Sequence, residues 1–93
     1  MNIYEITKND IITILQAEFK PLSLEVIDES SKHQGHAEAL LHPKAGHYRV
    51  TMTSANFDGL SQIKRHRLVY EKLADLMDSK IHALSLKLSA TNE

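Results

Sequence analysis

The chain has 93 residues, six histidines and no cysteine or tryptophan. This length accommodates one domain, and 42% hydrophobic with 25% charged residues is typical of a folded chain, which excludes a disordered one. Because the net charge is −1, binding of a polyanion would depend on a local basic patch. Without cysteine, the chain alone cannot form a disulfide, a thiol redox centre or a thiolate metal site.

The N-terminal residues 1–10 lack the features of a targeting sequence. They carry acidic side chains, without the apolar run of a secretory signal or the arginines of a transit peptide. No apolar run in the sequence approaches the ~20 residues that span a bilayer. We therefore expect a cytoplasmic protein with no membrane partner, and a processed mitochondrial form would have the same features.

Hydrophobic periodicity predicts a helix followed by a strand in the first third of the chain. Thr7 begins a sequence that resembles a capping box, and apolar residues recur at four-residue intervals from Ile11 to Phe19. Pro21 predicts the end of this helix. Residues 22–26 then alternate apolar and polar, which predicts a half-buried strand with Leu22, Leu24 and Val26 on its apolar face.

Between Asp28 and Gly46 the sequence shows no regular hydrophobic periodicity, and three of the six histidines lie in this stretch. A connection of this length in so small a domain is uncommon, and such connections are typically functional or mobile. We therefore expect a mobile, histidine-bearing loop over about residues 28–46.

The second half of the chain predicts a strand, a helix and a strand. Tyr48, Val50 and Met52 alternate with polar residues, and a turn at 56–59 with Ser61 as N-cap precedes a helix to about Asp78. The expected core stripe of this helix consists of Ile63, His66, Tyr70, Leu73 and Met77, widened by Val69 and Leu76. The expected solvent face consists of Lys64, Arg65, Glu71, Lys72 and Asp75. The last strand covers residues 81–88, with Leu84, Leu86 and Leu88 on one face and His82 of the same parity.

The order helix, strand, strand, helix, strand predicts an α+β fold. The first two strands should pair antiparallel, and the crossover through the second helix should return the last strand parallel to its neighbour. Both helices then cover one face of a three-stranded mixed sheet in a two-layer sandwich. We expect one domain over residues 1–93, with a core from about residue 7 to 88.

Four separated motifs occur in a characteristic order along the chain. They are Asp28-Glu29-Ser30, which the histidine-bearing loop follows, Phe57-Asp58-Gly59, Arg65-His66-Arg67-Leu68-Val69-Tyr70 and Ile81-His82-Ala83-Leu84. Together they closely resemble the BolA family, over about residues 11–88. The resemblance implies the family's αββαβ fold, which is related to the class II KH fold and agrees with the order of elements derived above.

The resemblance also implies an adaptor, and not an enzyme. BolA proteins pair with monothiol glutaredoxins and share a [2Fe–2S] cluster with them, for which the glutaredoxin cysteine and a glutathione supply thiolates. The family pattern implies His82 as one ligand from this chain and His33 as the second, from the loop. His36 competes with His33, because a mobile loop could present either. No cofactor is expected in the isolated chain.

The spacing of the residues alone predicts structural roles, and not ligand roles, for several histidines. A histidine such as His82 at a strand end typically packs at the rim of the core and bonds to backbone. A zinc site would need four ligands held tetrahedrally, and the H-x-x-H spacing of His33 and His36 does not fix that many. We expect His66 in the core, and His47 to be structural or at the rim of the site.

A second function is suggested by Lys64, Arg65 and Arg67, the basic cluster near Gly59. Some BolA proteins are described as DNA-binding transcriptional regulators, and KH domains clamp nucleic acid with a Gly-x-x-Gly loop before a helix. The corresponding run here, Gly59-Leu60-Ser61-Gln62, lacks the second glycine. A solvated or partner-docking face is therefore favoured, with DNA binding as the alternative. Asp28-Glu29-Ser30 has no base at a recognisable spacing, which predicts neither catalysis nor a small-molecule substrate.

Overall fold

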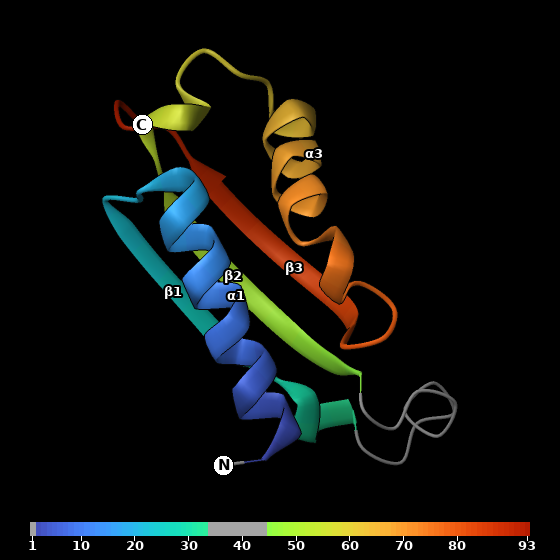
Figure 1. Ribbon diagram of the computed structural model, residues 1–93. Helices are drawn as coiled ribbons and strands as arrows, with labels where there is room; N and C mark the ends of the chain where they lie inside the picture. Colours follow the sequence, from blue (N-terminus) through green and yellow to red (C-terminus); the bar gives the residue numbers. More distant parts are fainter. Residues whose placement is uncertain (1, 34–44) are drawn as a thin grey trace.

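The computed structural model describes residues 2–33 and 45–93 and confirms the predicted α+β order. Figure 1 shows both long helices on the same face of a three-stranded sheet. The elements are α1 (Ile3–Phe19), β1 (Ser23–Asp28), η1 (Ser30–His33), β2 (Gly46–Thr53), η2 (Ala55–Phe57), α3 (Gln62–Lys72), η3 (Ala74–Leu76) and β3 (Ile81–Ser89). The η elements are short 3₁₀ turns.

The sheet has the order β1-β2-β3, with β2 in the centre. β1 pairs antiparallel with β2, with Val26 opposite Val50. β2 pairs parallel with β3, with Val50 opposite Leu86. Both predicted pairings are confirmed. Because β2 and β3 are parallel, their first residues meet at the same end of the sheet.

α1 begins four residues before the predicted start at Thr7. Its N-cap is Asn2, whose Oδ1 accepts a hydrogen bond from the Glu5 backbone N–H at 2.9 Å. Thr7 is fully buried inside the helix, so the prediction that it caps the helix is wrong. The end was predicted correctly, because Lys20 adopts a left-handed conformation (φ 43°) immediately before Pro21.

The core lies between the helices and the sheet. Its buried apolar residues include Ile11, Leu15, Phe19, Val26, Tyr48, Val50, Met52, Phe57, Val69, Leu73, Leu76, Ile81 and Leu88. The alternating faces predicted for β2 and the stripe predicted for α1 are confirmed. The face predicted for β1 is confirmed only in part, because the strand begins at Ser23 and Leu22 is 74% exposed.

The second helix differs most from its prediction. α3 ends at Lys72, six residues before the expected Asp78, and the chain continues as the 3₁₀ turn η3. Its core face is also rotated, because Arg65 and Val69 are buried while Ile63 is 64% exposed and Tyr70 is 38% exposed. Val69, Leu73 and Leu76 are buried as predicted, although Leu76 lies in the 3₁₀ turn η3 and not in α3.

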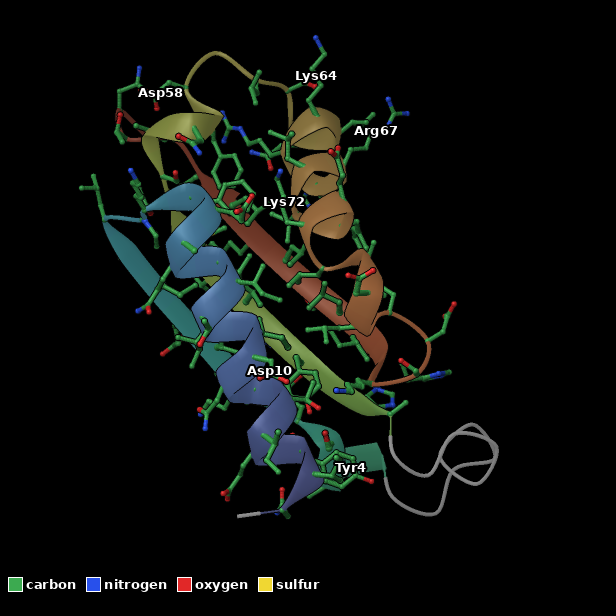
Figure 2. The ribbon with its side chains drawn as sticks, viewed as in Figure 1. Tyr4, Asp10, Asp58, Lys64, Arg67 and Lys72 are labelled. Atoms are coloured by element: carbon green, nitrogen blue, oxygen red, sulfur yellow. The ribbon has the colours of Figure 1, made fainter. Side chains whose placement is uncertain are left out.

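His66 is therefore a half-buried residue of α3 and not a core histidine, which corrects the prediction. Its Nδ1 lies 2.8 Å from the backbone oxygen of Gln62, one turn earlier in the helix. On the side of α3 that faces α1, the Lys72 Nζ lies 3.0 Å from Glu18 Oε1 and joins the two helices (Figure 2).

Side chains of α3 contact the backbone of β3, the strand at one edge of the sheet. The Tyr70 hydroxyl donates a hydrogen bond to the Leu84 carbonyl at 3.1 Å. The Leu88 carbonyl accepts from Gln62 Nε2 at 3.4 Å and from Arg65 Nη1 at 3.3 Å. α3 therefore satisfies carbonyl groups of the edge strand as well as covering the core.

The predicted loop over residues 28–46 is shorter at both ends, because Asp28 belongs to β1, η1 follows it directly, and Gly46 begins β2. Residues 34–44 lie outside the described residues, so the expected mobility stays a prediction. In the part of the chain that is described, no helix combines the length and apolar character needed to cross a membrane.

Candidate functional site

Two histidines meet where β2 and β3 begin. His47 is the second residue of β2, and His82 is the second residue of β3. Their ring centres are 5.2 Å apart, and the ring planes are inclined by 51°. The parallel pairing of the two strands thus places two imidazoles against each other at one end of the sheet.

A β-bulge makes this contact possible. Gly46 is paired with Ile81 and His47 with Ala83, so His82 is an extra residue in β3. Strict alternation would place His82 on the same face as Leu84, and His47 on the opposite face from Tyr48. A bulge locally bends the strand and redirects a side chain, which accounts for the meeting of the two rings.

The spacing of the two rings suits shared ligation. Two imidazoles that bind one tetrahedral metal ion at about 2.0–2.1 Å through nitrogen have ring centres roughly 5 Å apart. Within residues 2–33 and 45–93, no group of three or more histidine, cysteine, aspartate or glutamate side chains could hold a metal ion. Among the described residues, His47 and His82 thus form a pair of potential nitrogen ligands.

Glu29 and Ser30, which form the corner after β1, hold the backbone of His47. The Glu29 N–H donates to the His47 carbonyl at 2.8 Å, and the His47 N–H donates to Ser30 Oγ at 3.1 Å. Arg49 lies beside this corner, with its Nε 3.5 Å from Glu29 Oε2. A shallow depression of about 290 Å³ runs along the strands here, lined by Glu29, His47, Tyr48, Arg49, Ala83, Leu84 and Ser85.

The loop ligands predicted from the sequence are placed only in part. His33 is the last residue of η1, three residues after Ser30, which contacts His47. His36, the alternative to His33, lies outside the described residues, as does His42. The prediction that one of the loop histidines is a ligand therefore stays a prediction.

The basic cluster predicted from the sequence is divided by the fold. Lys64 and Arg67 are exposed and point away from the sheet (Figure 2), and Gly59 lies in an exposed turn with φ 78°. Arg65, by contrast, is only 4% exposed. The expectation that Arg65 lies on the solvent face is therefore wrong, and its guanidinium is not displayed to a nucleic acid.

Arg65 is buried because a carboxylate and carbonyl groups satisfy its guanidinium. Nη1 and Nη2 donate to Glu93 Oε1 and Oε2 at 2.7 and 2.6 Å, and Nε donates to the Leu60 carbonyl at 2.9 Å. The hydrogen bonds from Arg65, helped by one from the Ala90 N–H, lower the pKa of Glu93 from 4.5 to about 2. A buried arginine is tolerated when its charge is paired in this way.

The two candidate sites lie at opposite ends of the sheet. His47 and His82 stand where β2 and β3 begin, whereas Gly59 follows the end of β2 and Lys64 lies in the first turn of α3 (Figure 1). The histidine pair and Lys64 therefore lie on separate parts of the surface.

From the sequence, His47 was expected only to be structural or to lie at the rim of the site. The signal was present, because each of the two strands predicted to be parallel neighbours carries a histidine at its beginning. Placing the two side by side required the register and the bulge, and neither follows from hydrophobic alternation.

Comparison with known proteins identifies the family. The profile described as BolA-like protein matches residues 15–93. The chain is 38% identical over 80 residues to the chloroplastic protein BOLA1 of Arabidopsis thaliana, across 85% of this chain and 50% of that protein. It is 38% identical over 72 residues to the DNA-binding transcriptional regulator BolA of Escherichia coli, across 77% of this chain and 64% of that protein.

Solved structures agree with the sequence matches. The BolA domain of SufE1 from Arabidopsis thaliana superimposes with a TM-score of 0.80 at 35% identity, covering 92% of this chain and 93% of that one. The chain spans half the length of the chloroplastic BOLA1 and a fifth of the SufE-like protein 1 of the same plant. The family profile, the relatives and the fold agree: this chain belongs to the BolA family.

Proposed function

We propose that this protein is an adaptor that pairs with a monothiol glutaredoxin and contributes imidazole ligands to a [2Fe–2S] cluster shared by the two proteins, in iron–sulfur cluster assembly, cluster transfer or iron regulation. The observation that carries the proposal is the 5.2 Å separation of the His47 and His82 rings. Membership of the BolA family supports it, because the family pattern implies the His82 position as a ligand.

The chemistry of the donor set suits this role. In a [2Fe–2S] cluster with two histidines on one iron, imidazole replaces thiolate and raises the reduction potential. His47 and His82 would supply that pair from this chain, while the glutaredoxin and a glutathione supply the thiolates. His33 and His36 compete with His47 for the second position.

The location of the two histidines favours docking of a partner. Each imidazole is attached to the end of a strand whose backbone is held by the sheet, and ligands on strands are positioned more precisely than ligands on free loops. Both rings are partly exposed, so a partner can reach them. The role is that of an accessory protein and not of a catalyst. The compartment stays a prediction, because the relatives include chloroplastic and bacterial proteins.

The proposal is tested by assembling the cluster on a monothiol glutaredoxin with and without this protein and recording visible absorption and circular dichroism. Addition of the wild-type protein should produce a new spectrum that differs from that of the glutaredoxin alone. His82→Ala should abolish the change. His47→Ala, His33→Ala and His36→Ala, each measured singly, identify the second ligand.

His66→Ala is the matched control, because His66 is a half-buried histidine on α3 whose ring nitrogen bonds to backbone. It should give the wild-type spectrum. An unchanged mixed spectrum with His82→Ala would overturn the ligand assignment, and no mixed spectrum with the wild-type protein would overturn the proposal itself.

A second candidate function is DNA binding through the start of α3. Lys64 and Arg67 are exposed there, and one relative bears the name DNA-binding transcriptional regulator. With Arg65 occupied by Glu93, the basic surface retains only two of the three predicted cations. This weakens the candidate relative to the adaptor role.

A further inference from the structure

We propose that Ser30 is a positioning residue for the histidine pair, and that Ser30 and Gly46 together form a seat that fixes His47 against His82. The inference rests on the proposed function for the role of His47 as a ligand. The seat itself is a feature of the free protein. It also gives a structural role to the Asp28-Glu29-Ser30 motif.

Two consecutive residues, Glu29 and Ser30, hold the backbone of His47. The carbonyl of His47 accepts from the Glu29 N–H at 2.8 Å, and its N–H donates to Ser30 Oγ at 3.1 Å. Ser30 is in turn oriented by Asp28, whose Oδ1 accepts from the Ser30 N–H at 2.9 Å. Both backbone polar groups of His47 are thus satisfied by a corner that is itself fixed by a side-chain turn.

Gly46 allows this close approach. A Cβ at Gly46 would lie 2.5 Å from Ser30 Oγ and 2.7 Å from the hydroxyl oxygen of Tyr48, distances that real Cβ atoms do not tolerate. The absence of a side chain at this position lets the serine hydroxyl reach the next residue, His47. The Gly46 N–H also donates to the Lys80 carbonyl at 2.9 Å, two residues before His82. The seat therefore connects the beginnings of both strands.

The Tyr48 side chain lies next to Gly46 and limits the space there. It is 2% exposed, and its hydroxyl donates to the Tyr4 carbonyl in the first turn of α1 at 2.9 Å. Because this ring is fixed to α1, the space above Gly46 is filled by groups that cannot easily move. The hydroxyl of Ser30, itself buried, therefore has a defined position from which to hold His47.

The relation between the seat and the ligand pair follows from general behaviour of metal sites. Groups that orient a ligand without touching the metal typically change metal affinity roughly 10–100-fold when they are removed. Ser30→Ala removes the acceptor of the His47 N–H while keeping the size of the side chain nearly unchanged. We expect about a 10-fold loss of affinity for the shared cluster.

The experiment compares Ser30→Ala with Ser31→Ala, the exposed neighbour on the same 3₁₀ turn. In the free protein, nuclear Overhauser contacts between the ring protons of His47 and His82 are measured by NMR. Ser30→Ala should weaken these contacts and raise hydrogen exchange at the His47 amide at least 10-fold. Ser31→Ala should match the wild type in both. Ser30→Thr, which keeps the hydroxyl, should restore the amide protection.

The same variants are then tested for assembly of the mixed cluster with a glutaredoxin. Unchanged ring contacts and amide exchange in a folded Ser30→Ala variant would overturn the seat. Fast exchange of the His47 amide in the wild-type protein would overturn it as well, even if no variant folds. Absence of a mixed cluster with the wild-type protein would overturn the proposed function, while the NMR results on the free protein would still decide about the seat.

Discussion

Arg65 and Glu93 form a bidentate ion pair at the end of β3, with Nη1–Oε1 and Nη2–Oε2 distances of 2.7 and 2.6 Å. The same carboxylate accepts from the Ala90 N–H at 3.0 Å, and the same guanidinium donates to the Leu60 carbonyl. The Arg65–Glu93 ion pair therefore holds the segment after β3 against the beginning of α3. Its geometry is that of the strong, planar arginine–carboxylate contact.

Replacing Arg65 by methionine should lower the thermal stability of the protein. The substitution keeps much of the buried stem but removes the hydrogen bonds that the guanidinium donates to the Glu93 carboxylate and to the Leu60 and Leu88 carbonyls. Thermal unfolding followed by circular dichroism should show a fall in Tm of several degrees. Arg67→Met, at an exposed position of the same helix, is the control and should leave Tm unchanged. Equal effects of the two substitutions would contradict the buried pairing.

Glu93 should contribute stability in a defined pH range. Its pKa is lowered from 4.5 to about 2 in the folded protein, chiefly by the hydrogen bonds from Arg65. Since the folded state holds the proton less tightly than the unfolded state, the contribution is complete above the unfolded pKa and is lost as the pH falls from 4.5 towards 2. In denaturant titrations, the free energy of unfolding of the wild type should therefore exceed that of Glu93→Gln at neutral pH. This difference should become smaller below about pH 5. A difference independent of pH would count against this origin.

DNA binding, if present, should depend on Lys64 and Arg67 and not on Lys80. Each phosphate contact that is lost should weaken binding and reduce the slope of log affinity against log salt by about 0.9. Mobility-shift titrations of Lys64→Gln and Arg67→Gln at several salt concentrations measure both quantities. Lys80→Gln, an exposed lysine one residue before β3, is the control. A lack of salt-dependent binding by the wild-type protein would remove this candidate function.

Ser54 should be important for stability because it joins two elements. Its buried hydroxyl donates to the Phe19 carbonyl at the end of α1 at 2.7 Å and accepts from the Asn56 N–H at 3.1 Å. Ser54→Ala leaves both backbone groups without this partner and should cost about 1–3 kcal/mol in the free energy of unfolding. Ser23→Ala, at an exposed position of β1, should change stability by less than about 0.5 kcal/mol. Similar values for the two variants would show that the bridge is not stabilising.

The sheet and its connections could be predicted because they depend on local patterns. Apolar and polar residues alternate with a period of two from Tyr48 to Met52. Because a shift by one residue would exchange the core face and the solvent face of the strand, this pattern determines which side chains face the core. The order of the elements then determined the pairing of the strands. The start of α1 was missed because Asn2 and Thr7 are both acceptable caps by composition, and only the fold places Thr7 in the interior.

The buried face of α3 was predicted only in part from its own residues: Val69 is buried as predicted, whereas Arg65 is buried against the prediction. Arg65 enters the core because Glu93, which is 28 positions away in the sequence, supplies the carboxylate that satisfies it. Hydrophobicity assigns an arginine to the solvent and an isoleucine such as Ile63 to the core, and the fold reverses both assignments. The periodicity of residues along a helix does not predict an ion pair with a residue so distant in the sequence.

The ligand role of His82 is implied by its motif and stays a prediction. The closeness of His47 to it follows only from the parallel register and the bulge. The roles of Ser30 and Gly46 depend on distances across 16 residues of sequence, including a segment without regular alternation. Such contacts follow from the packed structure and not from the spacing of residue types.

The hydrogen bonds from α3 to β3 have a consequence for how this protein meets other proteins. A strand from a second molecule that added to the edge of β3 would have to displace the Tyr70 hydroxyl from Leu84 and the Arg65 guanidinium from Leu88. Unprotected edge strands are the usual starting points of aggregation. The edge of β3 is therefore protected against pairing with a strand of a second molecule, while His47 and His82 stay partly exposed at the beginnings of β2 and β3.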